Sequence, residues 1–239
     1  MNKVSFLFAG QGAQKLGMAR DLYETFPIVK ETFDKASHVL GYDLRELIDK
    51  DLDKLNQTKY TQPAILTTST AIYRLILKEI ELRPDMVAGL SLGEYSALVA
   101  SGAIRFEDAV VLVARRGQLM EAAAPAGSGK MVAVLNADRQ IIEDACKKAS
   151  QFGIVSPAIG NTEAQIMKKD DIKSLLARQV MEPVRFDESI ETMKKMGMTQ
   201  VVEIGPGKVL SGFLKKIDSS LSVHSVEDKI GFNNLKELN

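Results

Sequence analysis

The sequence lacks several features that mark particular classes of protein. Its 239 residues include one cysteine, Cys146, which excludes an internal disulfide, offers no metal-ligand spacing and suits a reducing cytoplasm. Basic and acidic side chains number 31 each, so the zero net charge disfavours nucleic acid or a membrane surface as the main partner. No apolar run approaches the length of a membrane span. We therefore expect a cytoplasmic protein that binds neither nucleic acid nor membrane.

Histidine is also scarce, since the chain contains only His38 and His224. His38 lies in a stretch typical of a surface helix, and His224 lies in a predicted strand near the C-terminus. A catalytic base must come within hydrogen-bonding distance of the group that it deprotonates. Because neither histidine lies near a catalytic motif in the sequence, we expect both to be solvent-facing or core residues.

Strand-like and helix-like segments alternate along the chain. Apolar runs at 4–10, 86–90 and 199–207 are typical of strands buried on both faces of a parallel sheet. Residues 61–81 have the apolar spacing of an amphipathic helix, with Pro63 in its first turn. This alternation predicts an α/β fold in which helices flank a mostly parallel sheet.

The motif G-x-S-x-G places Ser91 between Gly89 and Gly93, with a predicted strand before it and a predicted helix after it. The glycines permit a tight, strained turn that exposes the serine oxygen at the start of the helix. The backbone amides that follow face a developing oxyanion and are assisted by the helix dipole. This context favours a nucleophilic serine over an ordinary turn serine.

A second glycine-rich turn, AGQGAQ at residues 9–14, also follows a predicted strand. It has neither the G-x-G-x-x-G spacing nor a P-loop lysine, so nucleotide binding is disfavoured. A tight connection between strand and helix is the simplest interpretation. Alternatively, Gln11 could provide half of an oxyanion hole.

Six segments together resemble the malonyl-CoA:acyl carrier protein transacylases of fatty acid synthesis. The resemblance extends over nearly the whole chain and implies an acyltransferase core similar to the α/β-hydrolases. It also implies malonyl-CoA and an acyl carrier protein as partners, with no cofactor and no metal. In chain order the segments are FAGQGAQ, TQPAI, GLSLGEYSALVASG, ARRGQLM, RQVMEPVRF and EIGPGKVLSGFLKK.

The resemblance implies a role for individual residues. Ser91 would accept the malonyl group as an ester and pass it to the phosphopantetheine thiol of the carrier protein. Gln11 and the backbone N–H of Leu92 would form the oxyanion hole. Arg116 would bind the malonyl carboxylate through its planar guanidinium, and Arg115 beside it would be a surface residue.

Two further glutamines match the family. Gln62 would line the substrate pocket, and Gln179 would help to orient a catalytic histidine. Many members have histidine immediately before the nucleophile, where this chain has Leu90. That change is compatible with the turn.

The segment that carries the catalytic histidine in the family has no counterpart in this chain. Compared with the family, the junction Ala158–Ile159 omits roughly sixty to seventy residues, enough for half of a ferredoxin-like subdomain. The resemblance thus predicts a single internal deletion. The acyltransferase core would comprise 1–126 and 159–239, and 127–158 would be a truncated remnant of the ferredoxin-like subdomain.

Three functions follow, in order of preference. The first is malonyl transfer, as in the family. The second is an inactive or weakly active relative that binds malonyl-CoA or carrier protein, because a serine without its base is a weak nucleophile. The third is a hydrolase with a Ser–Asp dyad, similar to patatin-like lipases, but it needs an Asp-Gly pair and the chain has none.

Overall fold

The computed structural model describes residues 3–124, 140–141, 144, 148, 163–179 and 185–238. The chain divides into two compact units, one formed by Met1–Ala123 with Met193–Asn239 and the other by Ala124–Thr192. The predicted domain boundaries at 126/127 and 158/159 lie outside the described residues and stay predictions. Of the predicted ferredoxin-like remnant at 127–158, only residues 140–141, 144 and 148 are described.

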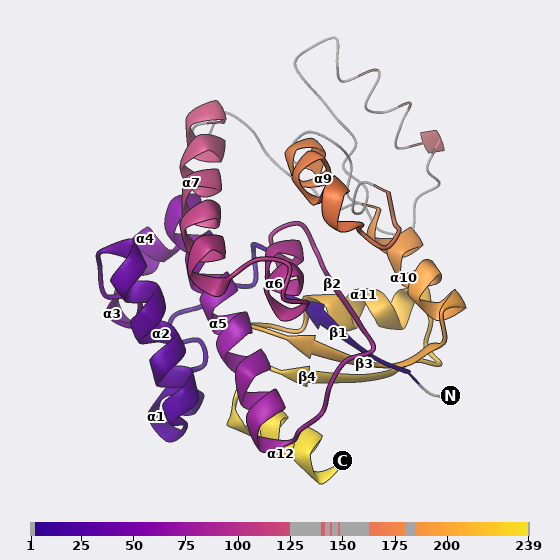
Figure 1. Cartoon of the computed structure of the whole chain (residues 1–239), viewed down its shortest axis with the longest axis horizontal. Coiled ribbons are helices and arrows are strands. Elements are labelled where there is room, and N and C mark those ends of the chain that lie inside the picture. Colours follow the sequence, from indigo (N-terminus) through magenta and orange to yellow (C-terminus); the bar gives the residue numbers. More distant parts are fainter. Residues whose placement is uncertain are drawn as a thin grey trace. The chain divides into compact units, whose positions relative to one another are not determined.

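A four-stranded parallel sheet in the order β2-β1-β3-β4 forms the centre of the larger unit (Figure 1). Most side chains of β1 and β3 are buried, as expected for central strands with neighbours on both sides. The parallel sheet confirms the predicted α/β class. The strands are β1 Lys3–Phe8, β2 Met86–Gly89, β3 Met198–Ile204 and β4 Ser222–Val226.

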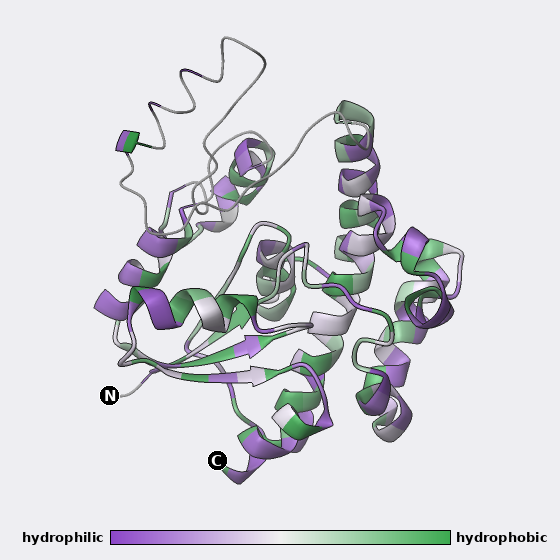
Figure 2. Cartoon of the chain, turned by 180° about the vertical axis from the view of Figure 1, so that it is seen from behind, coloured by the Kyte–Doolittle hydropathy of each residue, from purple (hydrophilic) through white to green (hydrophobic). Residues whose placement is uncertain are grey.

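Helices connect the strands, and many of them carry hydrophobic and hydrophilic residues in alternation, as amphipathic helices do (Figure 2). Helix α6 contacts β1 and β2, whereas α11 and α12 contact β4. The helices of the larger unit are α1 Arg20–Thr25, α2 Pro27–Leu40, α3 Leu44–Lys50, α4 Leu52–Leu55, α5 Thr58–Glu79, α6 Gly93–Ala100, α7 Phe106–Ala123, α11 Val209–Ile217 and α12 Lys229–Glu237.

In the smaller unit, the short helix η1 (Lys169–Asp171) leads into α9 (Ile172–Gln179). Helix α10 (Phe186–Lys195) follows. Its residues up to Thr192 belong to the smaller unit and those from Met193 to the larger one.

Helix α5 begins earlier than the sequence suggests. The expected start was Thr61, but the helix starts at Thr58, so Pro63 lies in its interior. The first turn closes before the proline, because the backbone N–H groups of Tyr60 and Thr61 both donate to the carbonyl of Gln57. Pro63 has no N–H to donate and does not need one to start the helix.

Helix α5 packs against α7 with direct backbone contact at Gly117. A Cβ atom added at Gly117 would lie 2.6 Å from the carbonyl oxygen of Thr58 and 2.7 Å from the Cα of Lys59. Only glycine fits this approach without moving one of the helices. The contact fixes the position of Arg116, the next residue toward the N-terminus of α7.

We therefore predict that Gly117→Ala destabilises the protein by about 1–3 kcal/mol, because a methyl group there overpacks two helix backbones. Gly212→Ala is the matched control, since Gly212 lies in α11 and an added Cβ would meet nothing within 4 Å. This control should stabilise the protein by roughly 0.5–1 kcal/mol. Urea unfolding measures both, and equal effects would refute the close contact.

Candidate active site

The turn between β2 and α6 has the geometry of a strained nucleophile elbow. Ser91 adopts the left-handed backbone conformation, with φ of 51°. A Cβ atom at Gly89 would lie 2.0 Å from the carbonyl carbon of Gly93, and one at Gly93 would lie 2.2 Å from the carbonyl oxygen of Phe8. Side chains are therefore excluded at Gly89 and Gly93, two residues before and two residues after the serine. Holding a residue such as Ser91 in this conformation costs about 1–3 kcal/mol, which the surrounding packing must offset.

Arg116 lies beside the serine. Its side chain comes from α7, the residue is 8% exposed, and its Nη2 donates a hydrogen bond to Ser91 Oγ at 3.2 Å. The guanidinium also lies over the ring of Tyr95, 5.4 Å from the ring centre. Burial lowers the pKa of Arg116, while the nearby Tyr95 and Glu94 act in the opposite direction. The neighbouring Arg115 is exposed.

Glu94 is a buried acidic residue that the sequence reasoning missed. It lies in the first turn of α6, three residues after Ser91, and is 4% exposed. Burial raises the pKa of Glu94 to about 8, although the positive charge of Arg116 acts to lower it. The available signal was a charged residue in an otherwise apolar helix, GEYSALVA.

The two glutamines predicted near the serine contact each other. Gln62 is fully buried, and its Nε2 donates to Gln11 Oε1 at 3.4 Å and to Met120 Sδ at 3.3 Å. Gln11 Nε2 in turn donates to Thr58 Oγ1 at 3.2 Å. The structure therefore brings the segments AGQGAQ and TQPAI together at the start of α5.

The AGQGAQ turn also lies against the elbow. A Cβ atom added at Gly10 would lie 2.7 Å from the carbonyl oxygen of Leu90. The loop of Gln11 and the turn that carries Ser91 and Leu92 are thus in backbone contact. Such contact is what a two-part oxyanion hole requires.

The remaining predicted residue, Gln179, is buried at the end of α9 in the smaller unit. His38 is exposed on α2, as expected. His224 lies on β4, where its Nε2 is 3.0 Å from Ser222 Oγ. Strand β4 and strand β2 are opposite edges of the sheet, three strand spacings of about 4.8 Å apart. His224 therefore cannot reach Ser91.

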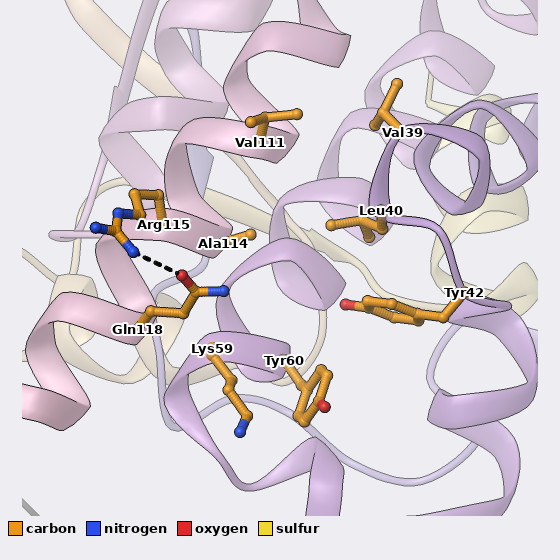
Figure 3. Close-up of a pocket in the computed structure, with 9 residues that line it drawn as sticks. All are labelled: Val39, Leu40, Tyr42, Lys59, Tyr60, Val111, Ala114, Arg115 and Gln118. Carbon is orange, nitrogen blue, oxygen red and sulfur yellow. Dashed lines mark hydrogen bonds between the residues drawn. The ribbon is translucent and has the colours of Figure 1, made fainter.

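A groove of about 460 Å³ lies between α2, α5 and α7. Tyr42, Tyr60 and Val111 line it together with Arg115 and Gln118, whose side chains point toward each other and share a hydrogen bond of 3.1 Å (Figure 3). It contains neither Arg116 nor any residue of the elbow, so it is separate from the serine site.

Comparison with known proteins identifies the family. The acyl transferase domain matches residues 5–178. The chain belongs to the acyl transferase family. Malonyl CoA-acyl carrier protein transacylase from Haemophilus influenzae is 34% identical to this acyl transferase, with 99% of each chain covered. The protein of the same name from Bacillus subtilis is 35% identical, with 100% of this chain and 99% of that protein covered.

Solved structures agree with this family. The MCAT structure from Streptococcus pneumoniae is 51% identical and has a TM-score of 0.95. The alignment covers 99% of this acyl transferase and 100% of that chain. A second solved structure is that of a type II PKS acyl-carrier protein in complex with its malonyl-transacylase. It is 33% identical, with a TM-score of 0.94 and full coverage of both chains. Among the residues that the structure describes, no helix has the length and apolar character needed to cross a membrane.

The alignments also bear on the predicted deletion. The alignment with the Haemophilus influenzae protein extends over 309 positions, whereas this acyl transferase has 239 residues, so at least 70 positions have no counterpart here. This difference agrees with the predicted internal deletion. Its location at Ala158–Ile159 lies outside the described residues and stays a prediction.

The raised pKa of Glu94 predicts a specific pH dependence of the free energy of unfolding. Because the folded acyl transferase holds the Glu94 proton more tightly than the unfolded chain, this contribution is complete below about pH 4.5 and is lost as the pH rises to about 8. Glu94→Gln removes the contribution. Relative to this variant, wild type should lose at most about 1.4 kcal/mol for each pH unit in that window.

Urea unfolding of both proteins at several pH values measures this difference, and all other titrating groups are common to the two. Parallel stability curves between pH 4.5 and 8 would show that Glu94 has an ordinary pKa.

Proposed function

We propose that this acyl transferase moves the malonyl group from malonyl-CoA to the phosphopantetheine thiol of an acyl carrier protein in fatty acid synthesis, through an ester on Ser91. The hydrogen bond of 3.2 Å between Arg116 and Ser91 carries this proposal, because it places a fixed cation beside the nucleophile. A malonyl thioester presents a carboxylate next to its reacting carbonyl and so matches this pair. The names of the transacylase relatives support the same activity.

In the first half of the reaction, Ser91 Oγ attacks the thioester carbonyl. The Leu92 N–H and Gln11 stabilise the oxyanion that develops, at the positive end of the α6 dipole. The carbon–sulfur bond then breaks, and the serine proton ends on the sulfur of coenzyme A. In the second half, the pantetheine thiol attacks the seryl ester and Ser91 regains a proton.

Two residues select and shape the substrate. Arg116 binds the malonyl carboxylate with its two-pronged guanidinium, which acetyl-CoA cannot engage. Gln62, fully buried behind Gln11, lines the acyl pocket. Gln179 corresponds to the residue that orients the catalytic histidine in the family, but this chain has no histidine in that segment for it to orient.

The thioester itself supplies the activated acyl group, so the reaction needs no cofactor and no metal. The single cysteine fits a cytoplasmic location. Residues 127–158 are assigned as the remnant of a ferredoxin-like subdomain, between core segments 1–126 and 159–239.

One observation favours the second candidate, a weakly active protein that binds malonyl-CoA or carrier protein. His224 is too far from Ser91 to act as its base, and His38 is exposed on α2. Loss of a catalytic base costs other serine enzymes about four to six orders of magnitude in rate. The comparisons lend this candidate no support, since the relatives named above are transacylases. The rate of acylation distinguishes the two.

The first prediction of the proposal concerns the ester. Incubation with malonyl-CoA should add the mass of one malonyl group to the intact protein, and peptide mapping should place it on Ser91. Ser91→Ala should remain unmodified, because it lacks the nucleophile, and Ser96→Ala in the following helix α6 should still be modified. No adduct on wild type after hours of incubation would refute acyl transfer.

The second prediction concerns selectivity. Arg116→Ala should reduce the preference for malonyl-CoA over acetyl-CoA by about 10- to 100-fold, the value of one charged hydrogen-bonded contact. Competition between the two thioesters for Ser91 measures it. Arg115→Ala is the matched control, since this adjacent arginine is exposed and should leave the preference unchanged. An unchanged preference in Arg116→Ala would overturn the carboxylate role.

A further inference from the structure

The loop of residues 9–17, here called the Gln11 loop, leads from β1 toward α1 and is held from two sides. On one side it is bonded to the region where α4 ends and α5 begins. Gln11 Nε2 donates to Thr58 Oγ1 at 3.2 Å, and Gln14 Nε2 donates to Asn56 Oδ1 at 3.1 Å. These contacts place one flank of the loop.

On the other flank the loop is bonded to the carboxylate of Glu227, the residue that follows β4. Its Oε2 accepts a hydrogen bond from Lys15 Nζ at 2.6 Å and another from the backbone N–H of Gly207 at 2.8 Å. The Glu227 side chain is 12% exposed and that of Lys15 is 53% exposed. Glu227 thus joins the Gln11 loop to the turn after β3, although 212 residues separate it from Lys15.

The turn after β3 in turn packs against the Gln11 loop through its glycines. Gly205 has φ of 120°, and a Cβ atom there would lie 2.9 Å from the Cβ of Ala9. A Cβ atom at Gly207 would lie 3.6 Å from the Cβ of Ala13. Glu227 therefore acts on the loop twice, directly through Lys15 and indirectly through Gly207.

The charge of Glu227 suits this role. Burial raises the pKa of Glu227, but the hydrogen bonds from Lys15 and from the Gly207 N–H together lower it by more. The net pKa therefore lies below the usual range. The carboxylate is ionised at neutral pH and can hold both donors.

We propose that Glu227 is a positioning residue for acyl transfer, because its bonds to Lys15 and Gly207 fix the Gln11 loop against the elbow of Ser91. This inference rests on the proposed function, in which Gln11 stabilises the oxyanion. Lys15 is half-exposed, so its ion pair with Glu227 contributes little to stability. Misplacing a catalytic group by about 1 Å can nevertheless cost about 100-fold in rate. The role therefore predicts a loss of rate without a comparable loss of stability.

The test is Glu227→Gln, which keeps the size of the side chain and removes its charge. The rate constant of Ser91 acylation at saturating malonyl-CoA should fall about tenfold, with KM within about twofold and an unchanged urea midpoint. Lys15→Met removes only the direct contact, so it should lower the rate by no more than Glu227→Gln does. The double variant should fall no further than Glu227→Gln alone, because the Lys15 bond needs Glu227. Glu31→Gln is the control, since Glu31 pairs with Lys35 on α2.

Amide hydrogen exchange provides a readout that needs no activity. Exchange at residues 11–15 should be faster in Glu227→Gln and unchanged in Glu31→Gln. Unchanged exchange in Glu227→Gln, faster exchange without slower acylation, or an equal fall of rate in Glu31→Gln would each overturn the inference. If wild type itself forms no ester, the proposed function fails, and exchange at residues 11–15 alone then decides whether Glu227 positions the loop.

Discussion

The close backbone approach at the start of α6 is the constraint on which the rest of the site depends. Gly89 and Gly93 leave no room for side chains, because the end of β2, the first turn of α6 and the carbonyl of Phe8 meet there. This packing holds Ser91 in a left-handed conformation at the start of a helix. It also buries Glu94 in the first turn of α6, where Arg116 lies close enough to affect its pKa.

The groups around Ser91 are held by connections between elements remote in sequence. Arg116 depends on the contact of α5 with α7 at Gly117. The turn after β3 is fixed by Glu203, a fully buried carboxylate that accepts the backbone N–H groups of Leu210 at 2.9 Å and Ser211 at 2.8 Å. A carboxylate at this position also complements the dipole of α11. The groups beside Ser91 are thus held by elements of the larger unit that are remote in sequence.

Much of this could be predicted from local sequence, because apolar runs and paired glycines constrain the backbone directly. The parallel strands and the elbow of Ser91 are of this kind. The predicted start of α5 was wrong. Pro63 is a strong signal for a first turn, but the hydrogen bonds to the Gln57 carbonyl start the helix before it. Glu94 carried one signal, a charged residue in an otherwise apolar helix, whereas Glu227 carried none, because contacts with distant segments determine its role.

The family resemblance predicted both the chemistry and the missing segment, and the structure shows that His224 does not replace the absent histidine. The central claim is that the elbow and its cation still support malonyl transfer. Its most direct test is a single-turnover reaction of the chain with malonyl-CoA and phosphopantetheinyl acyl carrier protein, followed by mass spectrometry of the carrier protein. The account predicts malonyl on the pantetheine thiol with wild type and none above background with Ser91→Ala. Equal, background-level transfer with both proteins would contradict it.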